Sequence, residues 1–300
     1  KRATPDTAWF LAASRVNSLA DQYAWREVGR EFDVTAEAFL TDKGFTPVAL
    51  QLCDIALNAN ALSSYSMLNL WRSLTLFAMD STSGPSEEVE GGAQRLPEAI
   101  AASLGEGTVR LRTAVSAISA DANGVEVRAG DQTLRAPFCV NTLPFPVLRK
   151  LPFEKAGEAS PLQPIIQAMP YTQIQQVHLE LERGPRDELP IMMWTDTPIE
   201  RVFPVRNESG ETVSLTCWIN GTGVRRSTSD ENWKALAEQT YMHWAPGQIQ
   251  TWAARITQPD GRLHFAGEHT SYLHTGMEGA MESGERAAYA IIEAAASPAG

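Results

Sequence analysis

The sequence predicts a mixed α/β fold, in which a helical region comes first, sheets occupy the middle and a strand–turn–helix unit closes the chain. Three observations lead to this class. Apolar residues recur at helical spacing through residues 1–80, and from Thr108 their spacing changes to two, which is typical of strands. Near the end, a short apolar strand stops at Gly267, and a helix begins after a polar loop. The chain therefore combines helices and sheets throughout its length.

Two capping signals mark helix starts in the N-terminal region. Thr4-Pro5 and Thr46-Pro47 each place a hydroxyl before a proline at the first helical position. The first signal predicts a long helix that reaches Tyr23, and the second predicts a helix from Val48 onward. Apolar spacing across residues 67–78 indicates a third helix. This region is predicted to be entirely helical.

The middle of the chain is predicted to form two sheets. Asn123-Gly124 and Gly130-Asp131 are dipeptides typical of hairpin turns, so they indicate a three-stranded meander. The strands of this meander are expected at residues 109–118, 125–127 and 134–140. Residues 161–221 contain further alternating segments, and we expect them to form a second sheet.

The closing segment, residues 261–292, has the residue types of a cofactor platform. Gly267 permits close backbone approach, and Glu268 places a polar group just beyond the strand end. The helix after Gly276 carries a face of small residues, and its first N–H groups, near Met277, have no helical partner. A tightly packed structural helix would show the same pattern. The pattern alone leaves both interpretations open.

Composition is that of a soluble globular protein with no nucleic-acid partner. A hydrophobic content of 43% allows a substantial core in one large domain or two smaller ones. The net charge of −11 would oppose binding to phosphates. There is neither a membrane-spanning run of about 20 apolar residues nor a signal-peptide pattern, although a processed start could have lost one. The sequence does not decide the location of the protein, but it favours the cytoplasm over export.

Cysteine and histidine usage predicts no metal site. The cysteines, Cys53, Cys139 and Cys217, are odd in number, widely spaced and set in apolar surroundings. They are therefore expected to be buried thiols rather than disulfides or metal ligands. The five histidines lack ligand spacing as well.

The motifs AGEHTS and GMEGAMESGERAA closely resemble the C-terminal flavin-binding motif of the flavin-containing amine oxidases, which include monoamine, polyamine and L-amino-acid oxidases. Four further stretches agree in the family's order: GGAQRLPEAIAASLG, VRLRTAVSAI, FCVNTLPFPVLRKL and WAPGQI. Together these stretches cover most of residues 91–292. The resemblance implies FAD as the cofactor, bound non-covalently, because Thr240 stands where some relatives carry the cysteine that attaches flavin.

The resemblance implies a fold of the FAD-linked reductase and amine oxidase type, with two interleaved domains. Residues 1–80 and 151–239 correspond to the helical part and the sheet-and-helix part of a substrate domain. Residues 81–150, with the meander, and the closing residues 240–300 correspond to an incomplete FAD domain. The GxGxxG turn that opens this family is absent from the sequence, and Gly91-Gly92 is no substitute, because no ordinary strand precedes it. We interpret the chain as a processed product, one subunit of a split enzyme, or a fragment.

Carried over residue by residue, the resemblance places the cofactor against both FAD-domain parts. Val115 matches a valine whose backbone contacts the adenine, and Trp244 matches an aromatic that packs beside the flavin. Either residue would look the same if it simply filled core space. The third group of contacts lies in the closing segment. Gly267 and Glu268 match the turn at the phosphate and ribityl portion, while the start of the closing helix, Gly276 and Met277, reaches the flavin ring.

Two predicted residues concern catalysis. Tyr241 matches one wall of the aromatic cage that amine oxidases place over the flavin, where a ring face can hold an amine nitrogen. The opposite wall falls on Gly276, so the cage is half open unless Tyr272 or His274 folds in from the loop. Gln176 stands where many relatives have a lysine that holds a water near the flavin. Glutamine can position a water, but it offers no positive charge near developing peroxide.

The function implied by the resemblance is FAD-dependent oxidation of an amine or L-amino acid. Hydride passes from the substrate's α-carbon to the flavin, the imine hydrolyses, and O2 or another acceptor reoxidises the flavin, with H2O2 as the product from O2. A second chain carrying the GxGxxG segment is an expected partner. Two alternatives are kept: a non-catalytic partner subunit or fragment, and a flavin dehydrogenase or desaturase of the same superfamily. Amine and amino-acid substrates are not separated at this point, since Arg72 is only a weak stand-in for a carboxylate-binding arginine.

Overall fold

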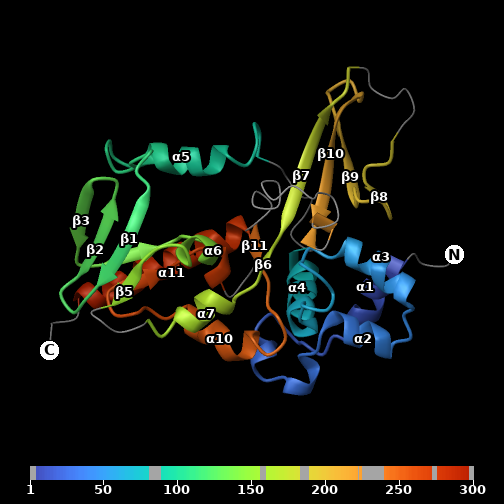
Figure 1. Cartoon of the computed structure of the whole chain (residues 1–300), viewed down its shortest axis with the longest axis horizontal. Helices are drawn as coiled ribbons and strands as arrows, with labels where there is room; N and C mark the ends of the chain where they lie inside the picture. The colour runs from blue at the N-terminus through green and yellow to red at the C-terminus, as the bar shows by residue number, and fades with distance from the viewer. Residues whose placement is uncertain are drawn as a thin grey trace.

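The structure is a computed structural model that describes residues 5–80, 89–155, 160–182, 189–221, 223–224, 240–271 and 276–296. Figure 1 shows two halves side by side. In one half, helices α1 to α4 lie beneath the sheet β7 to β10. The other half contains the meander β1 to β3, helix α5 above it and the long helix α11. Strands β6 and β11 run between the two halves (Figure 1).

The N-terminal region is helical, as predicted. It contains α1 (Pro5–Arg15), α2 (Ala36–Asp42), α3 (Pro47–Ala56) and α4 (Met67–Asp80). Thr46 caps α3, with its side-chain oxygen accepting the N–H of Ala49 at 3.3 Å. Helix α2 was not predicted, although Thr35 caps it in the same way, accepting the N–H of Ala38 at 3.0 Å. These hydroxyls fix where two of the helices begin.

The predicted long first helix is wrong in its length. Helix α1 ends at Arg15 rather than near Tyr23. Asn17 causes the turn, because its Oδ1 accepts the N–H of Leu19 at 3.1 Å, and its Nδ2 donates to the carbonyl of Trp71 at 3.3 Å. A side chain that bonds its own backbone in this way competes with helix continuation.

The meander is present, with corrected strand limits. It consists of β1 (Val115–Ala120), β2 (Val125–Ala129) and β3 (Gln132–Ala136), joined by β5 (Phe153–Lys155) in the order β3-β2-β1-β5. The first strand begins at Val115 instead of Val109, after Arg112 adopts a positive φ of 55° that interrupts extended backbone. The predicted strand over residues 134–140 is split at Pro137, which has no N–H for the ladder. Helix α5 (Arg95–Ser103) comes before this sheet in the chain.

The second sheet is confirmed and is antiparallel throughout. Its strands are β7 (Ile174–Glu180), β8 (Met193–Trp194), β9 (Arg201–Arg206) and β10 (Thr212–Asn220), in the order β7-β10-β9-β8. The short helices α6 (Phe145–Leu148) and α7 (Gln163–Ala168) come before it. Strand β6 (Tyr171–Thr172) pairs with β11 (Tyr241–Met242), which brings residues far apart in the sequence to the middle of the molecule.

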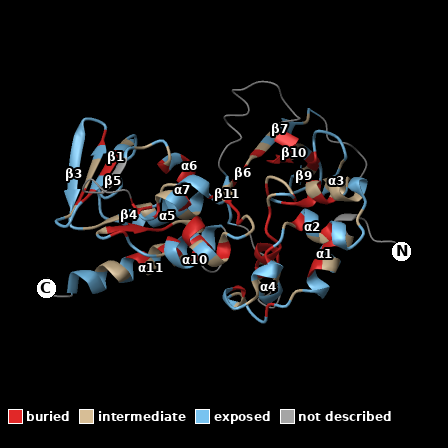
Figure 2. Cartoon of the chain, turned by 60° about the horizontal axis from the view of Figure 1, so that its bottom comes forward, coloured by how far each residue is buried: buried red, intermediate tan, exposed pale blue. Residues whose placement is uncertain are grey.

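The closing segment folds as predicted. Strand β12 (Leu263–Phe265) pairs in parallel with β4 (Cys139–Asn141), and all three residues of β12 are buried. A 3-10 turn (Glu268–Thr270) follows the strand, helix α10 (Ile249–Ile256) precedes it, and α11 (Met277–Ala296) ends the described chain. Figure 2 shows buried residues both in the N-terminal helical block, residues 5–80, and in this half. One core cluster contains both Trp9 of α1 and Phe265 of β12.

Asp33 connects the helical block to the loop before α10. Its Oδ1 accepts a hydrogen bond from the Ser66 hydroxyl, and its Oδ2 accepts the N–H of Gly247 at 2.6 Å. The N–H of Ser66 donates in turn to the carbonyl of Trp244 at 3.0 Å. Asp33 and Ser66 are both buried. A buried carboxylate that accepts from both sides fixes the distance between them.

The remaining fold-level predictions concern the cysteines and membrane segments. Cys53, Cys139 and Cys217 form no disulfide, as predicted. Cys53 and Cys217 are buried, whereas Cys139 is half-buried rather than buried as expected. Within the described ranges, no helix combines the length and the apolar character needed to cross a bilayer.

Replacing Asp33 by asparagine should destabilise the fold. The asparagine amide has one acceptor oxygen and one donor NH2 group in place of the two carboxylate oxygens. Its NH2 group would face either the Ser66 hydroxyl or the Gly247 N–H, so one of the two buried hydrogen bonds to residue 33 would be lost. We expect the free energy of unfolding to fall by about 2–3 kcal/mol, measured by urea denaturation. Asp42→Asn is the control, since Asp42 is exposed and forms a surface ion pair with the exposed Lys43, and it should change stability by less than about 0.5 kcal/mol. Equal effects of the two substitutions would contradict this role for Asp33.

Candidate active site

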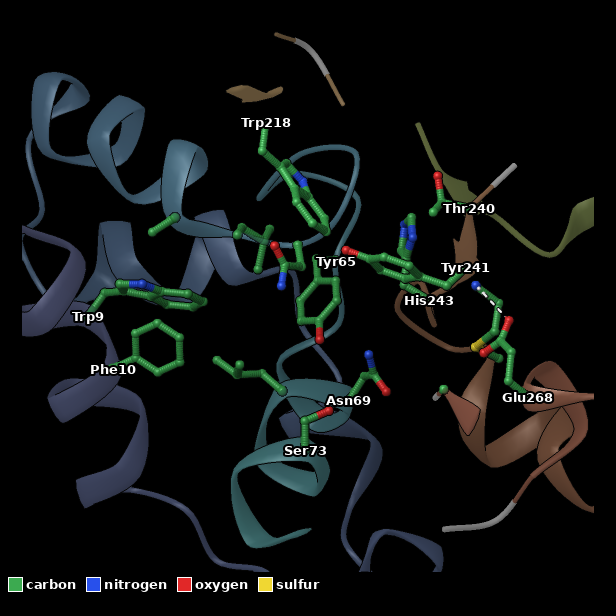
Figure 3. Close-up of a pocket in the computed structure, with 16 residues that line it drawn as sticks. Trp9, Phe10, Tyr65, Asn69, Ser73, Trp218, Thr240, Tyr241, His243 and Glu268 are labelled. Carbon is green, nitrogen blue, oxygen red and sulfur yellow. Dashed lines mark hydrogen bonds between the residues drawn. The ribbon is translucent and has the colours of Figure 1, made fainter. Parts of the chain in front are cut away.

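A cavity of about 430 Å³ opens where the helical block, the end of β10 and strand β11 meet (Figure 3). The helical block contributes Trp9, Phe10, Tyr65, Asn69, Leu70 and Ser73. Across from them stand Trp218, Thr240, Tyr241, His243, Glu268 and Gly276. The cavity therefore joins the predicted substrate-domain residues to the strand–turn–helix unit at the end of the chain.

Tyr241 projects into the centre of this cavity from β11, toward Tyr65 and Trp218 (Figure 3). Its strand is held against β6, where Tyr241 lies opposite Thr172. The hydroxyl is buried and has no hydrogen-bond partner. Burial raises the pKa of this phenol well above its ordinary value, so the side chain stays neutral. The tyrosine predicted as an aromatic wall thus lies at a cavity with an unpartnered hydroxyl, and its role stays a prediction.

Tyr65 faces Tyr241 from the other side and was missed by the sequence reasoning. Its hydroxyl is hydrogen-bonded by Asn69 and Ser73 of α4, and burial raises its pKa to about 12. Its ring lies 5.8 Å from the His243 ring. A signal existed, because Asn69 and Ser73 are spaced by four on α4 and Tyr65 stands at the same spacing just before this helix begins. Trp218 was also missed, since an alternating strand does not reveal which face meets a cavity.

The turn after β12 requires a glycine. Gly267 has φ 128° and ψ 161°, a region that is open essentially to glycine alone. A Cβ built on Gly267 would lie 2.5 Å from Cε1 of His269. The N–H of Gly267 donates to the Ser283 hydroxyl of α11 at 2.8 Å, which ties the strand end to the helix. The tight turn predicted at this glycine is therefore present.

Glu268 extends from this turn to the cavity. Its Oε1 accepts the N–H of Met242 at 3.3 Å, drawn as a dashed line in Figure 3, and its Oε2 is buried without a partner. Burial raises the pKa of this carboxyl to about 7, and the Met242 N–H offsets the rise only in part. Glu268 is thus poised between its protonated and ionised forms at neutral pH.

The start of α11 is open to solvent. Gly276 has a positive φ of 122°, and its carbonyl accepts the N–H of Ala280 at 3.0 Å as the first helical bond. Met277, the first helical residue, has a 51% exposed side chain. The turn at Gly267 and this helix start together offer backbone groups to a cofactor. These features fit a flavin dinucleotide for two reasons. A large group can approach the backbone at Gly267 and Gly276, where no Cβ intervenes, and the Tyr241 hydroxyl and Glu268 Oε2 are buried polar atoms without partners.

Three predicted site residues lie away from the cavity walls. Val115 begins β1 opposite Ala129 and packs against the core. Trp244 is 4% exposed within the same core. Gln176 is exposed on β7, directly opposite Trp218. The structure thus groups Tyr241, Glu268 and Gly276 at one cavity. Gly267 and Met277 are their neighbours in the sequence. The roles of these five residues, and of Val115, Trp244 and Gln176, stay predictions.

Two buried histidines flank the site. Nδ1 of His243 lies 3.1 Å from the Thr172 hydroxyl, and the Phe145 ring packs on His269 at 4.6 Å. The Nε2 atoms of both histidines are buried without partners. Burial lowers the pKa of each to about 4, so both rings are neutral at neutral pH. Tyr272 and His274, which were expected to complete the cage, lie outside the described residues.

Comparison with known proteins identifies the family. The sequence profile described as flavin containing amine oxidoreductase matches residues 2–233 and 225–292. The chain belongs to this family. Its cofactor class is therefore the flavin predicted as FAD. The parts of the chain that the structure describes contain no group of three or more His, Cys, Asp or Glu arranged to hold a metal ion.

The chain matches different shares of its individual relatives. YobN of Bacillus subtilis (strain 168), which carries the provisional name of an L-amino-acid oxidase, is 24% identical over 317 residues. That match covers 89% of this chain and 64% of YobN. An L-amino-acid oxidase of Siganus canaliculatus is 28% identical over 116 residues, which cover 29% of this chain and 22% of that protein. The chain thus spans less than two thirds of these relatives.

Solved structures of similar fold agree with the fold prediction. Cyclohexylamine oxidase from Brevibacterium oxydans IH-35A superposes with a TM-score of 0.74 at 17% identity, covering 96% of this chain and 74% of that chain. A putrescine oxidase bound to putrescine gives a TM-score of 0.68 at 14% identity, covering 98% and 76%. At these identities the likeness establishes the fold alone, which is that of the flavin amine oxidases.

Substitution of Gly267 by alanine should destabilise the closing segment. The methyl group would collide with His269 in a backbone region that side chains avoid. We expect a loss of about 2–4 kcal/mol in the free energy of unfolding, measured by chemical denaturation. Gly261→Ala is the matched control: Gly261 also has a positive φ, of 63°, but nothing lies within 4 Å of its Cβ position, so the loss should be about 1 kcal/mol. Similar losses in the two variants would argue against a tightly packed turn.

Glu268 should make stability depend on pH. Its pKa of about 7 in the folded state exceeds the ordinary value of 4.5, so the folded protein binds this proton more tightly, and stability falls as pH rises from 4.5 to 7. The lowered pKa values of His243 and His269 have the opposite effect, because they make stability rise between pH 4 and 6.5. The contribution of Glu268 is therefore isolated by comparing the parent protein with a Glu268 variant at each pH.

The measurement compares urea denaturation of the parent protein and of Glu268→Gln at several pH values. Relative to the variant, the parent should lose about 1–3 kcal/mol across this window. Glu285→Gln, on the exposed face of α11, should run parallel to the parent. A constant difference between the parent and Glu268→Gln at every pH would contradict the raised pKa.

Proposed function

We propose that this chain forms the amine-binding part of an FAD-dependent oxidase, which oxidises an amine or an L-amino acid and passes the electrons to O2 with formation of H2O2. The observation that carries this proposal is the convergence of Tyr241, Glu268 and Gly276 on one cavity, beside the start of α11. The names of relatives support the substrate class, since they include oxidases of cyclohexylamine, putrescine and L-amino acids.

The cofactor would lie along the closing segment and be held without a covalent bond. The backbone at Gly267 and Glu268 would hold the phosphate and ribityl portion, and the N–H of Met277 would reach the ring. Val115 and Trp244 would support the adenine and the ring from the core. Thr240 lines the cavity where a cysteine would be needed for a covalent thioether. When bound, FAD supplies the two-electron acceptor that no side chain of the protein provides.

The cavity walls would orient the amine as its neutral form. Tyr241 and Tyr65 stay protonated, and His243 stays neutral, so none of these three walls carries a charge at neutral pH. The rings of Tyr241, Tyr65 and Trp218 would exclude water and fix the substrate's α-carbon. Glu268, with a pKa of about 7, is the group placed to exchange a proton as the amine enters. Gln176, on the sheet face of Trp218, would hold a water for the later steps.

A further protein part carrying the GxGxxG unit would complete the FAD site. Two exposed apolar surfaces suit its docking. Helix α11 exposes Met277, Met281, Tyr289 and Ile292, the last two at 61% and 63%. Helix α5 has no buried residue and exposes Ile100. Apolar stripes of this kind are typical of surfaces that another protein part covers.

The first test is flavin binding followed by turnover. The protein is expressed with the complementing GxGxxG part, purified and examined for the flavin absorbance band, and then supplied with a panel of amines and L-amino acids. The proposal expects a yellow protein that releases peroxide. A colourless protein that also fails to bind added FAD would instead identify a non-catalytic partner. FAD binding without peroxide from any amine would indicate a dehydrogenase or desaturase.

Tyr241 offers a test of the aromatic wall. Tyr241→Ala removes the ring that faces the substrate and should lower kcat/KM by about 10- to 100-fold, on the scale of a lost ring contact of 1–3 kcal/mol. Tyr241→Phe keeps the ring face and removes only the unpartnered hydroxyl, so its loss should stay within about threefold for a simple amine. Steady-state peroxide release measures both. An alanine variant as active as the phenylalanine variant would exclude Tyr241 as a wall of the site.

A further inference from the structure

A row of four side chains crosses the second sheet beside the cavity. Trp194 of β8 lies directly opposite Arg201 of β9, Arg201 lies opposite Trp218 of β10, and Trp218 lies opposite Gln176 of β7. Residues directly opposite one another in antiparallel strands point to the same face of the sheet. Trp218 lines the cavity. Arg201 therefore lies on the cavity face of this sheet, next to a wall of the site.

The Arg201 guanidinium is held between two tryptophan rings. Its Cζ lies 5.3 Å from the Trp194 ring centroid and 5.4 Å from that of Trp218, and the residue is only 5% exposed. Nη1 donates to Oδ1 of Asn58 at 2.7 Å, and Asn58 is itself part of the cavity wall. The stacking and this hydrogen bond leave the guanidinium little freedom to turn.

One edge of this guanidinium is unused. Nε and Nη2 of Arg201 are both buried and have no hydrogen-bond partner. These two nitrogens point to the same side of the planar group, and their two parallel N–H bonds match the two oxygens of a carboxylate. Buried polar groups in folded proteins are nearly always hydrogen-bonded. An unpartnered, preoriented fork of this kind indicates a ligand that completes it.

The charge of Arg201 is only partly balanced within the protein. None of the ion pairs recorded among the described residues involves Arg201. Burial lowers the pKa of the Arg201 guanidinium, and Tyr241 and Glu200 offset this only in part. Oε2 of Glu200 accepts the N–H of Asn220 at 2.8 Å. The Tyr241 hydroxyl, which is also buried without a partner, points toward Trp218, the ring on which Arg201 stacks (Figure 3). Trp218 therefore lies next to both unsatisfied groups.

We propose that the Nε–Nη2 edge of Arg201, with the Tyr241 hydroxyl beside it, binds the carboxylate of the substrate, so that the substrate is an amino acid rather than a simple amine. The inference rests on the proposed function, because it assigns the substrate class of the same cavity. The helical wall opposite is apolar, with Trp9, Phe10 and Leu70 among its residues. An amino acid with an apolar side chain therefore matches both ends of the cavity.

Ligand binding tests the subsite without any turnover. Phenylacetate carries a carboxylate on an apolar group, and 2-phenylethanol is its uncharged counterpart. Each is titrated into the purified protein by calorimetry. We expect phenylacetate to bind at least tenfold more tightly, and Arg201→Met to remove at least tenfold of its affinity while leaving 2-phenylethanol unchanged. Arg206→Met, at the exposed far end of the same strand, is the matched control and should bind as the parent does.

Three results would overturn the subsite: equal affinity of the parent for the two compounds, no binding of phenylacetate, or full phenylacetate affinity in Arg201→Met. If that variant fails to fold, Arg201→Lys replaces it. Lysine keeps the charge and loses the fork, so phenylacetate affinity should drop severalfold; an unchanged affinity would again overturn the subsite.

In the flavin-loaded protein, kcat/KM for L-phenylalanine relative to phenethylamine should fall at least tenfold in Arg201→Met. If the parent protein oxidises phenethylamine as efficiently as L-phenylalanine, the carboxylate subsite at Arg201 is wrong, while the proposed function stands. Binding of phenylacetate by a protein that never takes up FAD would defeat the proposed function alone.

Discussion

The cavity depends on the carboxylate of Asp33. Apart from Trp218 of β10, the wall residues named above come from two parts of the chain far apart in the sequence, the N-terminal helical block and the segment that begins at Thr240. Asp33 accepts hydrogen bonds from Ser66 of the first part and from Gly247 of the second. The N–H of Ser66 also donates to the Trp244 carbonyl, which holds the same junction a second time. Tyr65 directly precedes Ser66, and Tyr241 lies three residues before Trp244. The separation of the two tyrosines across the cavity is therefore set by buried polar contacts rather than by the sheet that carries Tyr241, which has only two strands.

Burial determines the charge state of the cavity walls. Tyr65, Tyr241 and His243 are each kept neutral because ionisation would place a charge where water cannot reach it. Glu268 lies near the midpoint of its titration for the same reason. Arg201 differs, since its guanidinium is buried yet stacked between two rings and bonded to Asn58. A neutral amine held by uncharged walls, with the carboxylate of the same amino acid at Arg201, would suit this distribution.

Local signals in the sequence predicted most elements correctly. Thr46-Pro47 located α3, Asn123-Gly124 located a hairpin, and the run around Gly267 located the strand, turn and helix of the closing segment. Errors occurred where a single side chain ended an element. Asn17 stopped α1 early through its own backbone bonds, and Pro137 divided a run that otherwise read as one strand. Apolar periodicity records the preference for an element and does not register such local interruptions.

The site was predictable only in part, for a related reason. Tyr241, Glu268 and Gly276 were found because they lie within or beside sequence motifs. Tyr65 and Trp218 lie outside any motif, and they reach the cavity through long-range contacts: the ring packing of Tyr65 on His243 and the cross-strand pairing of Trp218 in the second sheet. Strand register decides which side chains share a face, and register is a property of the folded sheet.

The most direct test of the central claim, that this cavity presents an amine to a flavin, is anaerobic mixing of the FAD-loaded protein with an amine or L-amino acid. With oxygen excluded, electrons that leave the substrate stay on the cofactor. The account predicts that the flavin absorbance band declines when substrate is added and returns when air is admitted. A band that stays unchanged with every amine and amino acid, in protein that demonstrably holds FAD, would contradict it.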